Sequence, residues 1–328
     1  MGTDTPWGMV LHYPDDRLTE ILNQGGVTWL RTSVLFEIQP KPGSAPVWGE
    51  TDRVAAAAAR RGQQLYLGLS PNYPGWITRG MPVTTVDDDW PRPRPRPGDR
   101  EPSAEEQEAW RTRLTHWENF VRQVVGKFGP LGVTYFNIGN EPNDAGFYHY
   151  GAADYINQLV IAARVIHTAG YKVCAPDITS RDNNPFDFLR LCLKRLRDER
   201  IALDVVTIHG YPRGGHATSE LLSTLYQIVP ILREYGISAP VWLTETGVDN
   251  TLSDAMQNNG QRVKEICSWI GEGTVNLPSA PWRTVTVPKF LKKVFFFVWS
   301  DDLTYGWLDS NRNPKPHLWD AYRSVTGK

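Results

Sequence analysis

The sequence has few cysteines and no long apolar run. Its 328 residues include only three cysteines, Cys174, Cys192 and Cys267, which lie far apart within apolar stretches. We expect buried free thiols, and neither a disulfide framework nor a cysteine metal site. No stretch approaches the ~20 apolar residues of a membrane-spanning helix, and Met1 to Val10 lack the segments of a signal peptide. We therefore expect a soluble chain, either cytoplasmic or secreted with its leader absent from this sequence.

The sequence also lacks an excess of charge of either sign. Lys and Arg number 35 against 36 Asp and Glu. This balance gives no basic surface for nucleic acid or for an anionic membrane, so we expect neither as a partner. No spacing of His, Cys, Asp and Glu is typical of a metal site, and no glycine-rich phosphate loop precedes a helix. We expect a monomer that uses no cofactor and no metal.

Short β-rich apolar runs alternate with longer helical patterns about eight times along the chain. This alternation predicts successive βα units around a parallel sheet, and eight of them predict the α/β class and a (β/α)8 TIM barrel. A barrel of this kind can use all of residues 1–328 as one catalytic domain. The predicted strands are Trp7–His12, Thr28–Val34, Gln64–Leu69, Thr134–Gly139, Lys172–Pro176, Asp204–His209, Pro240–Thr244 and Val294–Trp299.

Two stretches interrupt the regular alternation. Pro74–Pro102 contains alternating prolines, which favour an extended conformation, and it follows the third strand. It is either a wall of a cleft at the mouth of the barrel or a solvated surface arm. Gly271–Pro288 precedes the eighth strand, so we expect it to pack across the opposite face of the barrel.

Two predicted strands end in a glutamate. Tyr135–Pro142 reads YFNIGNEP and places Glu141 after the fourth strand, and Val241–Gly247 reads VWLTETG and places Glu245 after the seventh. The carboxyl ends of barrel strands surround one cavity, so the two carboxylates should face each other. Hydrolysis of a glycosidic bond needs such a pair, one group to protonate the leaving oxygen and one to attack the anomeric carbon. Either glutamate taken alone could instead cap a helix or pair with an arginine.

These motifs resemble clan A of the glycoside hydrolases, which are TIM-barrel enzymes that act with retention. Asn140-Glu141-Pro142 matches the acid/base motif of the clan, and Thr244–Gly247 matches the segment around its nucleophile. Gly26–Arg31 and Asp204–Pro212 resemble the second and sixth strands of family 39 and of the cellulase-like family 5.

The resemblance implies roles for individual residues. It implies that Glu141 is the acid/base and Glu245 the nucleophile, that Asn140 binds a sugar hydroxyl, and that Arg31 and Tyr211 hold the nucleophile. The chain departs from the family pattern in two places. Phe36 stands where tryptophan is usual after the second strand, and Thr246 stands where phenylalanine often follows the nucleophile.

Further sugar contacts are expected from histidines and aromatic rings at strand ends. His12 and His209 either contact sugar hydroxyls or are hydrogen-bonded structural residues. Sugar C–H faces stack on aromatic rings, and Trp299, at the end of the last strand, is the strongest candidate by position and by family likeness. The other candidates at the mouth are Tyr73, Trp76, Trp90, Tyr148, Tyr305 and Trp307.

Together these features predict a retaining glycoside hydrolase that cleaves β-glycosidic bonds of an oligo- or polysaccharide by double displacement. The many mouth aromatics favour an enzyme that cuts within chains. The alternatives are a β-glycosidase that acts on chain ends, an inverting hydrolase, or a barrel that binds carbohydrate without catalysis.

Overall fold

The structure is a computed structural model of the chain. It describes residues 5–11, 16–36, 39, 44–74, 104–144, 146–148, 150–180, 185–212, 218–269, 273–276, 284–287, 291–302 and 304–327. Almost all of the proline-rich stretch, from residue 75 to 102, lies outside these ranges, so its expected place at the mouth stays a prediction. Within the described ranges, no helix has the length and apolar character needed to cross a membrane.

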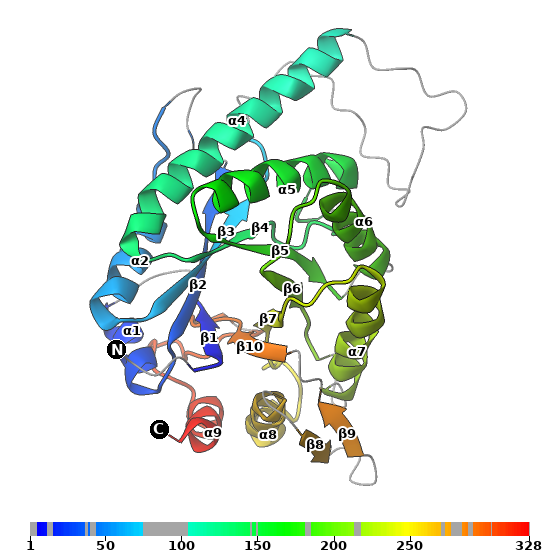
Figure 1. Cartoon of the computed structure of the whole chain (residues 1–328). Coiled ribbons are helices and arrows are strands. Elements are labelled where there is room, and N and C mark those ends of the chain that lie inside the picture. Colours follow the sequence, from blue (N-terminus) through cyan, green and yellow to red (C-terminus); the bar gives the residue numbers. More distant parts are fainter. Residues whose placement is uncertain are drawn as a thin grey trace.

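Eight parallel strands close into a barrel, in the order β1-β10-β7-β6-β5-β4-β3-β2. Figure 1 shows the helices arranged around this sheet, with the long helix α4 extending past the edge of the barrel. The barrel strands are β1 (Trp7–Val10), β2 (Trp29–Leu35), β3 (Gln64–Ser70), β4 (Tyr135–Ile138), β5 (Lys172–Thr179), β6 (Val205–His209), β7 (Val241–Thr246) and β10 (Leu291–Phe296). The expected TIM barrel is confirmed.

The helices form where apolar residues recur with the helical period and pack against the outside of the sheet. In α6, for example, Leu189, Cys192, Leu193 and Leu196 fall on one buried face. The helices are α1 (Asp16–Gln24), α2 (Gly49–Arg61), α4 (Ala104–Phe128), α5 (Gly151–Thr168), α6 (Pro185–Asp198), α7 (Thr218–Glu234), α8 (Ala255–Ser268) and α9 (Pro316–Thr326), with a 3-10 turn, η2, at Gly129–Leu131.

Aromatic rings fill the amino-terminal end of the barrel. Trp29 begins β2 and contacts Tyr135, the first residue of β4, and Trp242 of β7, with ring centroids 5.5 and 5.2 Å apart. Phe295 of β10 closes this cluster against Trp29. Because this end is packed with rings, polar side chains gather at the other end, where the strands finish.

The segment before the last barrel strand contains a small second sheet. The described residues of Gly271–Pro288 form an antiparallel pair, β8 (Gly273–Asn276) and β9 (Thr284–Val287), and the expected packing of this segment across the opposite face of the barrel stays a prediction. The pair follows α8 along the chain (Figure 1). The three cysteines are buried and free, as expected.

Candidate active site

Glu141 lies just beyond the end of β4, in a backbone conformation that few side chains adopt. Its φ is +48°, and the chain reaches it through Gly139 at φ +104°. A Cβ atom at Gly139 would lie 2.9 Å from the ring of Tyr155, so glycine is required there. The Glu141 N–H donates to the carbonyl of Asp177 on β5 at 3.0 Å, which holds this turn in place. A left-handed glutamate costs about 1–3 kcal/mol and marks a site where the side chain must be aimed.

Glu245 is the last residue but one of β7, and two side chains bind its carboxylate. Arg31 of β2 forms an ion pair with Oε1, and the Tyr211 hydroxyl donates to Oε2 at 2.7 Å. Burial alone would raise the pKa of Glu245, but the charges of His209 and Arg31 and the Tyr211 hydrogen bond outweigh burial and lower it. Glu245 is therefore an ionised carboxylate at neutral pH.

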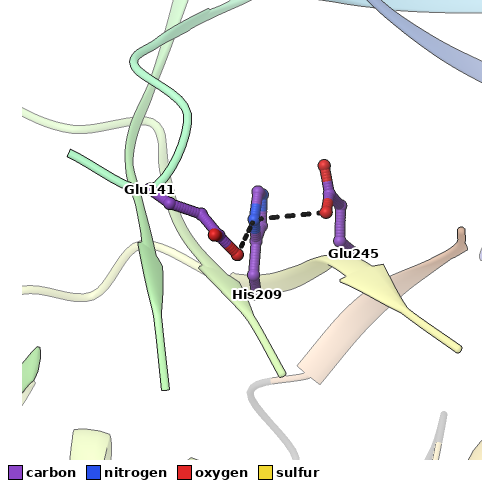
Figure 2. A group of neighbouring side chains, drawn as sticks. All are labelled: Glu141, His209 and Glu245. Atoms are coloured by element: carbon purple, nitrogen blue, oxygen red, sulfur yellow. Dashed lines mark hydrogen bonds and ion pairs between the residues drawn. The ribbon is translucent and has the colours of Figure 1, made fainter. Parts of the chain in front are cut away.

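His209, the last residue of β6, lies between the two glutamates. Its Nδ1 is 3.0 Å from Oε1 of Glu141 and 3.4 Å from Oε2 of Glu245 (Figure 2). Burial would lower the pKa of His209, but the charges of Glu245 and Asp177 and hydrogen bonds to Asp177 and Glu141 raise it to about 9. The imidazole is therefore protonated at neutral pH.

Asp177, a fully buried residue near the end of β5, completes the charge network. Its Oδ1 accepts hydrogen bonds from Thr244 at 2.5 Å and Tyr66 at 3.2 Å, and its Oδ2 accepts from Asn137 at 2.6 Å and Arg31 at 3.0 Å. Burial would raise the pKa of this carboxyl, but the neighbouring cations and donors lower it well below the ordinary value. Asp177 is thus a permanent anion beneath the two glutamates.

Sequence reasoning did not select Asp177. The available signal was that Asp177 is the single charged residue in VCAPDIT, the sequence that runs to the end of the fifth strand. A carboxylate there has to be paired, because an isolated buried charge is too costly.

The structure brings together most of the side chains expected at the site. Arg31, His209 and Tyr211 contact the glutamates as described above, and Arg31 Nη2 also donates to Oδ1 of Asn140 at 3.0 Å. His12 and Trp76 lie outside the described residues, as does Trp90, so their expected sugar contacts stay predictions.

Trp299 differs from the expectation of an open aromatic platform. It is 1% exposed and packs against Trp319 of α9, with ring centroids 5.1 Å apart. The strand β10 already ends at Phe296, and beyond it the backbone N–H of Trp299 donates to the carbonyl of Val10, which places this residue beside the end of β1. Tyr73, Tyr148 and Trp307 are buried as well.

Phe297, two residues before Trp299 in the chain, contacts Tyr211 of the site. It is only partly buried and packs edge-on against Tyr211, the hydrogen-bond donor to Glu245, with ring centroids 6.1 Å apart. Tyr305, also partly buried, lies 4.8 Å from the Tyr211 ring. Two aromatic rings thus lie against Tyr211, which donates to Glu245.

Among the described residues, one group of side chains has the spacing to hold a metal ion, and it is Glu141, His209 and Glu245 themselves. Each offers one ligand atom, and these atoms lie within 4.8 Å of one another. Metal ligation needs a neutral imidazole. The Arg31 guanidinium beside Glu245 and the proton on His209 both disfavour a cation at this position.

Comparisons with known proteins agree with this geometry. Residues 121–274, just under half of the chain, match the family model described as glycosyl hydrolase catalytic core. The matched segment includes Glu141, Asp177, His209 and Glu245, and it ends before β10. The sequence matches no curated protein.

Several solved structures share the fold. A family 39 glycoside hydrolase from Bacteroides cellulosilyticus WH2 is 17% identical, with a TM-score of 0.66 over 98% of this chain and 63% of that one. A monomeric β-xylosidase from Caulobacter crescentus CB15 is 16% identical, with a TM-score of 0.65 over 98% and 68%. A family 128 endo-β-1,3-glucanase from Amycolatopsis mediterranei is 13% identical, with a TM-score of 0.54 over 98% and 99%. The chain therefore spans about two thirds of the first two structures and nearly all of the third. The expected resemblance to clan A is confirmed.

Proposed function

We propose that this chain, an O-glycosyl hydrolase with a clan A barrel, cleaves β-glycosidic bonds with retention of configuration. Glu245 is the nucleophile and Glu141 the acid/base of a double displacement. The observation that carries the proposal is that two buried carboxylates face each other across His209 with different partners. Glu245 is held ionised by Arg31 and Tyr211, and no cation other than His209 contacts Glu141 within the described ranges.

The separation of the two carboxylates supports retention. An oxygen of Glu141 and an oxygen of Glu245 lie within 4.8 Å. Retaining glycosidases place their carboxyl groups about 5–5.5 Å apart, whereas inverting ones leave about 6.5–9.5 Å to admit a water molecule. The shorter spacing favours direct attack by Glu245 on the anomeric carbon over attack by a water molecule.

The charges of the site suit both steps of this mechanism. In the first step the Glu245 carboxylate bonds to the anomeric carbon while Glu141 gives its proton to the leaving oxygen. In the second step Glu141 takes a proton from water as that water displaces Glu245. Arg31 and Tyr211 orient the nucleophile throughout, since each binds a different oxygen of its carboxylate.

Rescue by azide tests both assignments. Glu141→Ala should still form the glycosyl-enzyme from an aryl glycoside whose leaving group needs no proton, and azide should restore turnover and give the β-glycosyl azide. Glu245→Ala leaves room for azide only on the vacated side, so its product should be the α-glycosyl azide. The matched control is Glu234→Ala, an exposed glutamate on α7, which should keep wild-type kinetics. Equal loss on good and poor leaving groups in Glu141→Ala, or substantial unaided activity in Glu245→Ala, would overturn the roles.

We further propose that the substrate is an oligo- or polysaccharide cut within the chain by a monomeric enzyme. The support is that this chain spans nearly all of the Amycolatopsis structure, an endo-β-1,3-glucanase, but only about two thirds of the Caulobacter β-xylosidase. The alternative is a β-glycosidase that acts on chain ends.

Product sizing separates these modes of action. The enzyme is incubated with β-1,3-glucan, cellulose-type β-glucan, xylan, mannan and galactan, and products are sized at early times. An enzyme that cuts within chains releases oligosaccharides of mixed length, whereas one that acts on chain ends releases one small sugar from the start. Binding without any product would favour a non-catalytic barrel.

A further inference from the structure

We propose that Asp177 is a positioning residue for Glu141 that acts through His209. By accepting a hydrogen bond from Nε2–H of His209, it turns Nδ1 toward Glu141, so that one proton is shared between His209 and the acid/base. The inference rests on the proposed function, because it takes Glu141 as the acid/base.

The three residues form a line across three neighbouring strands. Oδ2 of Asp177 lies 3.3 Å from Nε2 of His209, and Nδ1 on the other side of the ring lies 3.0 Å from Oε1 of Glu141. Asp177 and His209 are fully buried, so water does not compete for these contacts. The Asp177 N–H also donates to Thr207 at 2.9 Å, and its carbonyl accepts from the Glu141 N–H. Asp177 therefore fixes both the backbone of Glu141 and the ring that faces its side chain.

Arg31 competes with Asp177 for the same ring nitrogen. Its Nη2 lies 3.2 Å from Nε2 of His209, and a guanidinium can only donate. A neutral imidazole that accepts from Arg31 would carry its proton on Nδ1, whereas one that donates to Asp177 would carry it on Nε2. The charged groups around the ring are Glu141, Asp177, Glu245 and Arg31, that is, three carboxylates and one cation. This excess of negative charge favours the doubly protonated ring, in which Nε2–H faces Asp177 and Nδ1–H faces Glu141.

The pair of His209 and Glu141 then holds one exchangeable proton. With the proton on Nδ1, Glu141 is ionised; with the proton on Oε1, His209 is neutral and accepts the hydrogen bond. Only the second form can protonate the leaving oxygen, and after that transfer Glu141 is a carboxylate beside a neutral ring. In the second step Glu141 takes a proton from the attacking water, and the pair is restored. The shared proton is lost at alkaline pH, so the titration of the pair sets the alkaline limb of activity.

The first experiment is the pH profile of Asp177→Asn. Asparagine tolerates the φ of +49° at this position, and it removes the charge and replaces one acceptor oxygen by an NH2 donor. The alkaline limb of kcat/KM should move down by about one pH unit or more, the usual effect of a charge at this distance. Above about pH 9, where both proteins lie on the alkaline limb, a shift of one pH unit should lower turnover of a poor leaving group about tenfold and turnover of a good one less. The matched control is Tyr66→Phe, which removes a neutral donor to Asp177 and leaves its charge, so it should keep the wild-type limb. An unchanged limb in folded Asp177→Asn overturns the proposal.

The second experiment needs no catalysis. Nitrogen-15 NMR of labelled imidazoles reports which ring nitrogen carries a proton, and His209 is assigned among the seven histidines by its loss in His209→Gln. In the wild type, Nε2 should stay protonated while Nδ1 titrates near pH 9. In Asp177→Asn, the apparent pKa should fall and the neutral ring should carry its proton on Nδ1. A neutral wild-type ring protonated on Nδ1 would refute the inference. A correct NMR result with failed azide rescue would instead refute the roles of the glutamates and leave the tautomer assignment standing.

Discussion

Stability should fall as pH rises through the titration of His209. Its pKa is about 9 in the folded protein and about 6.5 in an unfolded chain, so the folded state holds a proton that the unfolded state releases. A group whose pKa is raised by folding contributes stability that is complete below its unfolded pKa and lost as pH rises through its folded pKa. At about 1.4 kcal/mol for each pH unit, the rise corresponds to a loss on the order of 3 kcal/mol between pH 6.5 and 9.

Urea unfolding at a series of pH values measures this loss. The thirteen tryptophans supply the fluorescence signal, and the free energy of unfolding is extrapolated at each pH for the wild type and for His209→Gln. Burial raises the pKa of all three cysteine thiols, so they add a loss above about pH 8.5 that both proteins share. Between pH 6.5 and 8.5 the wild type should therefore lose stability more steeply than the variant. Equal slopes in the two proteins would refute the raised pKa of His209.

Three substitutions probe aromatic residues that follow barrel strands β6 and β10. Trp299→Ala should lower the free energy of unfolding by about 3–5 kcal/mol, the usual cost of truncating a fully buried aromatic residue, and a melting temperature close to wild type would contradict its burial. Phe297→Ala should lower the free energy of unfolding less than Trp299→Ala does, but it should lower kcat/KM, because the partly buried Phe297 ring contacts Tyr211. Unchanged kinetics would show that Phe297 does not contact the substrate. Tyr211→Phe removes a hydrogen bond to the charged Glu245. Such a bond contributes about 1.5–3 kcal/mol, so kcat/KM should fall by about 10- to 100-fold. An unaltered kcat/KM would show that the bond does not aid catalysis.

The barrel was predictable from sequence because its signal is local. Each strand is a short apolar run bounded by helical periodicity, and all eight predicted barrel strands are present. Glu141 and Glu245 could be paired from their places at strand ends, since every such end meets at one mouth. Asp177 could not be selected in this way, because its importance depends on side chains from five other strands, β2, β3, β4, β6 and β7. Trp299 was misplaced because its orientation depends on the residue at which β10 ends, and strand boundaries are the least certain part of a sequence-based prediction.

The charged residues of the site come together only when the strands form the closed barrel. These residues come from strands as far apart in the sequence as β2, which supplies Arg31, and β7, which supplies Glu245. The segment that matches the catalytic-core model contains both glutamates but begins well after Arg31. A fragment made of β4 to β7 would therefore hold the anions of the site without the guanidinium that pairs with them. The remaining strands, added as separate fragments, would supply this counter-charge with β2, so recovered activity in a fragment-complementation assay would report that all eight strands have closed the barrel.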